Sequence, residues 1–188
     1  MLWHLVCRSR PSTGAGQPPK CGRQCCWPIA VHNDKAPPGV VRRMSSVMSV
    51  LVRSERFGDV ECDDAATVVF PDGLLGFEEE REFVVMPADP EGIYSWLQST
   101  RTPSLAFLTT SPTCFFADYA VEIDDAEVAE IEILDESEAM VLAIVTIAED
   151  RATANLLGPI VVNTRTRRAR QVVLADSTWS TKELLGEF

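Results

Sequence analysis

Residues 154–163 read Ala-Asn-Leu-Leu-Gly-Pro-Ile-Val-Val-Asn, and residues 168–174 read Arg-Ala-Arg-Gln-Val-Val-Leu. The apolar run 160–162 lies between two asparagines, Asn155 and Asn163, and a basic turn separates it from the second apolar run. Short β-branched runs joined by a polar turn are typical of an antiparallel hairpin. This segment therefore predicts a β-hairpin that carries polar side chains at its ends.

The same pattern extends over most of the chain that precedes this hairpin. Short runs of β-branched and aromatic residues, separated by turn residues, predict strands at 50–54, 58–62, 67–70, 82–86, 94–98, 105–109, 119–123, 140–147, 160–162 and 171–174. No repeating strand–helix–strand unit of about 30 residues appears, which argues against a doubly wound sheet. The pattern predicts a mainly β fold, a small antiparallel β-barrel-like domain with one or two short helices.

Two segments refine that expectation. Residues 141–147 are continuously apolar, which is typical of a central strand covered on both faces. Asp124 or Asp125 is placed to cap a short helix that runs through Ile131. We expect the first segment to be central to the sheet and the second to form a short helix of one or two turns.

Charge divides the chain into two parts. Residues 1–47 hold seven Lys or Arg and one acid, a formal charge of +6, which leaves ten basic and 27 acidic residues, a formal charge of −17, for residues 48–188. The first part is rich in Pro, Gly, Ser, Arg and Cys and predicts a disordered leader. Because Met44 and Met48 directly precede the patterned region, translation could start at one of them; the alternative is a real, disordered extension. Residues 48–188 are predicted to form one β domain.

Composition also limits the kinds of partner that the chain can bind. No apolar run approaches the roughly 18 residues that a membrane span requires, and the first residues lack the long apolar region of a secretory signal. We therefore expect a cytoplasmic protein with no membrane contact. An acidic body repels phosphate backbones and attracts basic protein surfaces, so no direct nucleic-acid binding is expected.

Catalytic groups are scarce. Both histidines, His4 and His32, lie in the predicted leader, which excludes histidine-based acid–base or triad chemistry in the body. Neighbouring carboxylates such as Asp63 and Asp64 are abundant; we interpret them as surface acids, and a carboxylate-based hydrolase is a remote alternative. We expect no enzymatic activity and no cofactor.

The cysteines do not form a recognisable metal site. Cys21, Cys25 and Cys26 cluster in the leader, but their spacing matches no standard zinc pattern and no second ligand pair follows, so no metal is expected. Cys62 and Cys114 are far apart in sequence and are predicted to be free, partly buried thiols.

Two charged stretches have alternative interpretations. Residues 122–138 contain nine acids and no base. They predict a solvated loop around a short helix, or a docking face for a basic partner. The turn 165–170 holds four arginines, which predict a solvated hairpin turn or contacts to the protein's own acids; a nucleic-acid contact is the functional alternative.

The order and spacing of several motifs resemble the flagellar assembly factor FliW family from about residue 57 to 185. The motifs are Phe-Gly-Asp-Val-Glu at 57–61, Phe-Pro-Asp-Gly-Leu-Leu-Gly-Phe at 70–77, Trp-Leu-Gln-Ser at 96–99, Leu-Ala-Phe at 105–107, the 153–163 segment, and Arg168 with 170–174. The chain departs from the family pattern in its leader, in the tail after Ser180, and at Gly158, where the family usually has alanine.

The resemblance implies a non-enzymatic regulator that binds flagellin and the translational repressor CsrA. Binding would relieve repression of flagellin synthesis, and free flagellin would compete for the factor. A flagellin chaperone without a regulatory role is the alternative. We expect a monomer when free, and a partner-binding set of Gln98, Ser99, Asn155, Asn163, Arg168 and Gln171. For Asn155 and Asn163 a purely structural role, tying down their own turns, is the competing interpretation.

Overall fold

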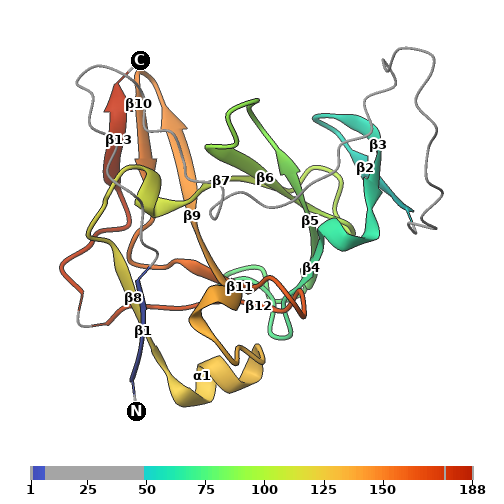
Figure 1. Ribbon diagram of the computed structural model, residues 1–188. Coiled ribbons are helices and arrows are strands. Elements are labelled where there is room, and N and C mark those ends of the chain that lie inside the picture. Colours follow the sequence, from blue (N-terminus) through green and yellow to red (C-terminus); the bar gives the residue numbers. More distant parts are fainter. Residues whose placement is uncertain (1, 7–48, 176, 188) are drawn as a thin grey trace, which may run out of the picture.

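The computed structural model describes residues 2–6, 49–175 and 177–187 (Figure 1). The predicted division into a leader at 1–47 and a domain at 48–188 stays a prediction, because residues 1 and 7–48 lie outside the described part. The cysteine cluster and His32 fall in that region as well. Leu2–Val6 is described and forms strand β1.

One large antiparallel sheet forms the body. Its strands lie in the order β12 (Ala169–Gln171), β11 (Ile160–Asn163), β9 (Ala139–Ala148), β7 (Ala106–Thr110), β6 (Tyr94–Ser99), β5 (Glu82–Pro87) and β4 (Thr67–Val69). β10 (Arg151–Ala154) pairs with the outer half of β9 and with β13 (Glu183–Glu187). Two strand pairs accompany this sheet, β2 (Ser49–Ser54) with β3 (Gly58–Asp63), and β1 with β8 (Ala120–Asp124).

The helical content is small. Its elements are α1 (Asp125–Glu130) and three single-turn 3₁₀ helices at Asp64–Ala66, Pro112–Cys114 and Glu136–Glu138. The predicted helix is confirmed, with Asp124 as the N-cap residue, although its side chain accepts no capping hydrogen bond. Val128 and Ile131 are buried and anchor the helix to the body. None of the helices in the described ranges is long and apolar enough to cross a membrane.

The sheet curls until its two edges meet at a single point. The Val69 amide donates to the Arg167 carbonyl at 2.8 Å, and Val69 forms a parallel bridge with Arg168, which directly precedes β12. No continuous ladder joins β4 to β12, so the sheet is barrel-like without being a closed barrel. The prediction of a mainly β, antiparallel, barrel-like fold is confirmed.

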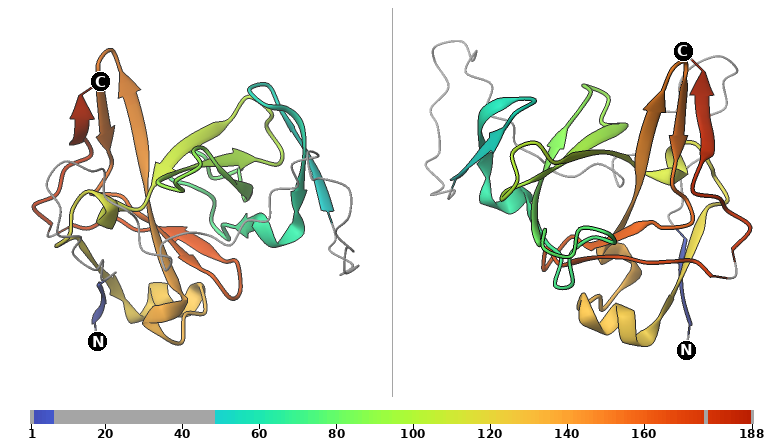
Figure 2. Two further views of the ribbon diagram at one scale, coloured as in Figure 1. Left: turned by 45° about the horizontal axis from the view of Figure 1, so that its top comes forward. Right: turned by 180° about the vertical axis from the view of Figure 1, so that it is seen from behind.

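Strand β9 explains why the sheet is held together. Its side chains alternate, so Met140 and Leu142 enter the core enclosed by the curled sheet, while Val141 and Ala143 enter a second core shared with β8 and α1. This confirms the prediction of a strand covered on both faces. The strand is exposed from Thr146 onward. There it extends away from the body of the sheet together with β10 and β13 (Figures 1 and 2).

One predicted strand has different limits in the structure, and strands β10 and β13 were not predicted. β12 ends at Gln171, where the sequence predicted a strand through residue 174. Residues 172–174 are still extended alongside the 157–159 loop, held by Val172 N–H to Pro159 O and Leu174 N–H to Leu157 O, both 2.9 Å. β10 and β13 were not predicted, because their sequences are short and lack a run of β-branched or aromatic residues. β10 is a strand through its pairing with both β9 and β13, and β13 pairs with β10.

Candidate partner-binding site

The six predicted partner-binding residues lie in three separate pairs. The first pair, Gln98 and Ser99, is fully buried at the end of β6. The Gln98 amide donates to backbone carbonyls of the following loop, including Leu105 O at 3.0 Å and Ser99 O at 3.1 Å. These bonds fix the turn between β6 and β7.

Ser99 also fixes a buried carboxylate. Its hydroxyl donates to Glu80 Oε2 at 2.6 Å, and the Thr102 hydroxyl donates to Glu80 Oε1 at 2.5 Å. Hydrogen bonds from Ser99 and then Thr102 hold the pKa of Glu80 below its ordinary value. The group is therefore ionised at neutral pH and ties two loops together.

The second pair is Asn163 and Arg168. Asn163 is fully buried; its amide donates to Ile131 O at 2.9 Å and Glu132 O at 2.8 Å, and its side-chain oxygen accepts from the amides of Arg165 and Thr166. The structural interpretation of Asn163 thus has four hydrogen bonds in its support. Arg168 Nε donates to Glu130 O at 3.1 Å and its side chain is partly exposed.

The third pair, Asn155 and Gln171, lies around Gly158. The Asn155 side chain accepts from Gly158 N–H at 2.9 Å, and the Gln171 amide donates to Gly158 O at 3.0 Å. A Cβ on Gly158 would approach the amide nitrogens of Asn155 at 3.1 Å and Gln171 at 3.2 Å. The Gln171 side chain also accepts a hydrogen bond from Leu75 N–H at 3.2 Å, which links the residues around Gly158 to the loop after β4.

The arginine-rich turn contacts the protein's own acids, as the simpler interpretation predicted. Arg165 pairs with Glu138 at 2.8 Å and Arg168 with Glu132 at 3.8 Å. Arg170 contacts three carboxylates from two different elements, Asp72, Glu127 and Glu130. These contacts fasten the hairpin to α1 and to the loop after β4.

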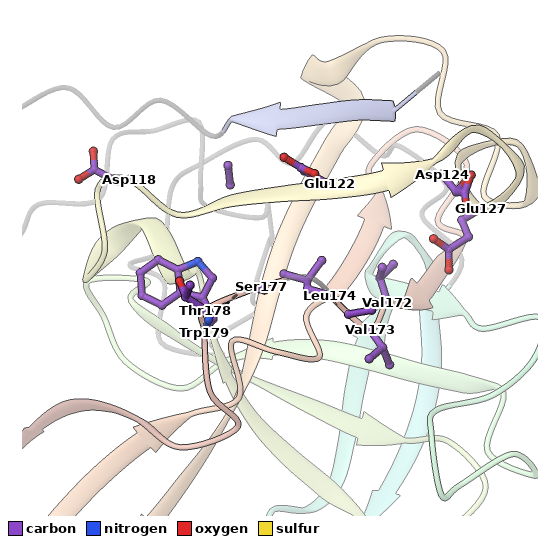
Figure 3. Close-up of a pocket in the computed structure, with 12 residues that line it drawn as sticks. Asp118, Glu122, Asp124, Glu127, Val172, Val173, Leu174, Ser177, Thr178 and Trp179 are labelled. Carbon is purple, nitrogen blue, oxygen red and sulfur yellow. Dashed lines mark hydrogen bonds between the residues drawn. The ribbon is translucent and has the colours of Figure 1, made fainter.

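The structure adds a groove that the sequence did not predict (Figure 3). It has a volume of about 470 Å³ and lies between β8 and residues 172–179. We call it the acidic groove, defined by Asp118, Glu122, Asp124 and Glu127 on one side and by Val173 and Trp179 on the other. Glu127 pairs with Arg170 at 3.5 Å. A groove with further carboxylates beside the exposed Val173 still suits a basic polypeptide segment better than a phosphate-bearing ligand.

Local structure explains how the acidic groove forms. Along β8 the side chains of Val121 and Ile123 are fully buried, so the alternate positions Glu122 and Asp124 face outward. On the other wall, Trp179 packs edge-on against Phe116 and Tyr119, each at a centroid distance of 5.4 Å. The Tyr119 hydroxyl donates to Leu156 O at 2.8 Å, and burial raises the pKa of this hydroxyl.

A sequence signal for one wall existed. Acids alternate with β-branched residues over 121–124, inside the acid-rich run that was considered as a docking face. The opposite wall comes from residues about 50 positions later, and nothing local marks it.

A smaller, mainly apolar pocket of about 200 Å³ lies between the β2–β3 hairpin and strands β5 and β6. Phe57, Met86 and Trp96 line it, and the Arg56 guanidinium lies 4.7 Å from the centroid of the Trp96 ring. Cys62 also lines it, and burial raises the pKa of this thiol. Cys62 and Cys114 are both free and at least partly buried, as predicted.

The described residues contain no cluster of three or more His, Cys, Asp or Glu side chains arranged to hold a metal ion. The carboxyls with a resolved change, Glu80, Asp135 and Glu138, all have a lowered pKa. For Asp135 the cause is the hydrogen bonds from Ser137, and for Glu138 it is the Leu134 amide followed by Arg165. A general acid requires the opposite direction of shift.

Comparison with known proteins identifies the family. The model of the "FliW protein" family matches residues 51–185. The flagellar assembly factor FliW of Syntrophotalea carbinolica is 46% identical over 131 residues, covering 69% of this chain and 94% of the relative. The Bacillus subtilis factor of the same name is 34% identical over 139 residues, covering 73% and 97%. A crystal structure of the flagellar assembly factor FliW superimposes with a TM-score of 0.67 at 33% identity, covering 73% of this chain and 97% of that chain. The chain therefore belongs to the FliW family of flagellar assembly factors.

Proposed function

We propose that this chain is a non-enzymatic regulator that binds a CsrA-type translational repressor and flagellin, and that flagellin competes with the repressor. It would act in the cytoplasm, where the repressor acts on messenger RNA, and as a monomer when free. Because the chain belongs to the FliW family, this binding would serve flagellar assembly. The observation that carries the proposal is the acidic groove, which offers carboxylates beside exposed apolar groups.

Charge supports a protein partner over a nucleic acid. Residues 48–188 carry a formal charge of −17, and Arg165, Arg168 and Arg170 of the turn contact carboxylates of the same chain. Such a surface accelerates encounter with a basic protein and repels RNA. Arg168, Asn155 and Gln171, the predicted binding residues that are not fully buried, are the members of that set able to contact a partner directly. Gln98, Ser99 and Asn163 would contribute by holding their loops.

The test measures association of the purified chain with CsrA at low and at moderate salt, by calorimetry. The groove variant is Asp118→Lys with Glu122→Lys; the control, Glu149→Lys with Asp150→Lys, changes the net charge equally at the β9–β10 turn. We expect the groove variant to bind about tenfold more weakly, close to 1.4 kcal/mol, and the control to bind nearly as the wild type does. Equal affinities for all three proteins would remove the groove from the proposal. Absence of any complex at low salt would overturn the repressor function itself.

A second measurement separates the regulator from a chaperone. The chain is added to a complex of CsrA with labelled flagellin messenger RNA, with and without flagellin. The regulator releases the RNA, and flagellin reverses that release. A chaperone without a regulatory role binds flagellin and leaves the RNA complex unchanged.

A further inference from the structure

Strand β8 has an unusual hydrogen-bonding position in this fold. Val121 and Ile123 anchor it in the core, but among the described strands its ladder partner is β1 alone. The segment that supplies β1, Leu2–Val6, lies far before residue 51, where the family match begins. The matched relatives are covered to 94–97% of their own lengths by the part of this chain that they resemble. The ladder partner of β8 is thus a segment outside the shared fold.

An extended strand whose backbone edge is open is a template for another strand. The structure contains an example of such an addition, because β1 pairs antiparallel with β8 over five residues, from Leu2 opposite Asp124 to Val6 opposite Ala120 (Figure 1). From these observations, and resting on the proposed function, we propose that the β8 edge is a strand-addition site for an extended partner segment of alternating basic and apolar residues, and that Leu2–Val6 covers this site in the free chain.

The register and the charges define the partner segment. Register pairing sets the apolar residues Leu5 and Trp3 opposite the buried Val121 and Ile123, and sets His4 opposite Glu122. A strand added to β8 shares its alternation, so one set of positions continues the apolar core and the other faces the acidic side of β8. Figure 3 shows β1 along one side of β8 and the groove residues 172–174 and 177–179 along the other. An added strand therefore lies across β8 from that wall of the groove, and the carboxylates opposite it are those of β8 itself, Glu122 and Asp124. Basic side chains at every second position match these carboxylates.

The first experiment tests whether β1 protects the edge. Leu5→Pro in the full-length chain removes a backbone donor from β1, and Leu5→Val is the matched control that retains a strand-forming residue. Hydrogen exchange measured by mass spectrometry should show protected amides at 120–124 in the wild type and in Leu5→Val, and faster exchange in Leu5→Pro. Equal exchange in all three proteins would overturn the assignment of β1 as the cover. Near-UV circular dichroism checks that the body remains folded.

The second experiment tests the addition site with fluorescein-labelled pentapeptides, Lys-Val-Lys-Val-Lys and, as a charge control, Glu-Val-Glu-Val-Glu. We expect the lysine peptide to bind Leu5→Pro about tenfold more tightly than the wild type, which corresponds to β1 covering the edge about nine-tenths of the time. Binding should restore protection at 120–124, and the glutamate peptide should not bind. Binding that leaves exchange at 120–124 unchanged, or equal binding of both peptides, would overturn the proposal.

The two proposals fail in different ways. The peptide measurements contain neither flagellin nor the repressor, so a negative result there leaves binding of those proteins intact. Conversely, if the peptide binds β8 but the repressor and flagellin do not associate with the chain, the strand-addition site stands and the proposed function falls.

Discussion

The buried polar side chains that hold loops together and the acidic groove both consist of polar residues. The first bind other parts of the same chain, whereas the second faces outward. At the joint around Asn163, a fully buried amide makes four hydrogen bonds to backbone groups of the same chain. In the groove, Asp118 and Asp124 are exposed, whereas Val121 and Ile123 of β8 are buried. A polar residue whose bonds are completed internally secures the fold, whereas an outward acid beside apolar surface offers charge to a partner. The comparison can be tested on both sides.

The largest effect is expected at Asn163. Asn163→Ala leaves two backbone carbonyls and two amides without their side-chain partner, so we expect the free energy of unfolding to fall by about 2–4 kcal/mol. Asn155→Ala, which removes the single bond to Gly158 N–H, should cost about 1 kcal/mol. Urea unfolding followed by tryptophan fluorescence measures both. A loss at Asn163 no larger than that at Asn155 would contradict the comparison.

An intermediate, pH-dependent effect is expected at Glu80. Its pKa lies below the ordinary value, so its contribution to stability is complete at neutral pH and is lost as the pH falls through the folded-state pKa. Glu80→Gln should lower the free energy of unfolding at neutral pH by about 1–2 kcal/mol. The difference from the wild type should shrink as the pH falls through the lowered folded-state pKa of Glu80, because protonation removes the advantage of the carboxylate. Urea midpoints measured at several pH values test this, and a constant difference across the range would count against a charge-based joint.

The smallest effect on stability is expected in the groove. Asp118→Lys alone should change the free energy of unfolding by no more than about 0.5 kcal/mol, since outward surface substitutions seldom cost more. The same urea measurement serves. A loss of unfolding free energy above about 1 kcal/mol would show that this groove acid supports the fold. The groove and the buried polar residues would then not differ in the way proposed.

The sequence predicted the parts of the fold in which local pattern and final environment agree. Continuous apolar residues over 141–147 indicated a strand covered on both faces, and β9 has that position. Alternation and turn residues placed most other strands within one or two positions. β10 and β13 carry no such pattern. β10 is held by pairing with β9 and β13, and β13 is a strand through its pairing with β10, in which Leu184 lies opposite Thr153.

The candidate site was less accessible to prediction for a related reason. The Asn163 side-chain amide donates two hydrogen bonds to the carbonyls of Ile131 and Glu132, about 30 residues earlier. The sequence therefore does not reveal that this side chain already has its partners. The groove requires Trp179 to face β8 across more than 50 residues. The acid-rich run marked one wall correctly as a charged surface, but long-range packing decides where that surface becomes a groove. The role of the six predicted residues in partner binding stays a prediction.

Strand β9 has a consequence for how the molecule comes apart. The two cores share its side chains residue by residue, so neither can melt while the other keeps its native packing. We therefore expect both cores to unfold together in one all-or-none step on heating or in denaturant. A truncation within β9 should yield no independently stable fragment.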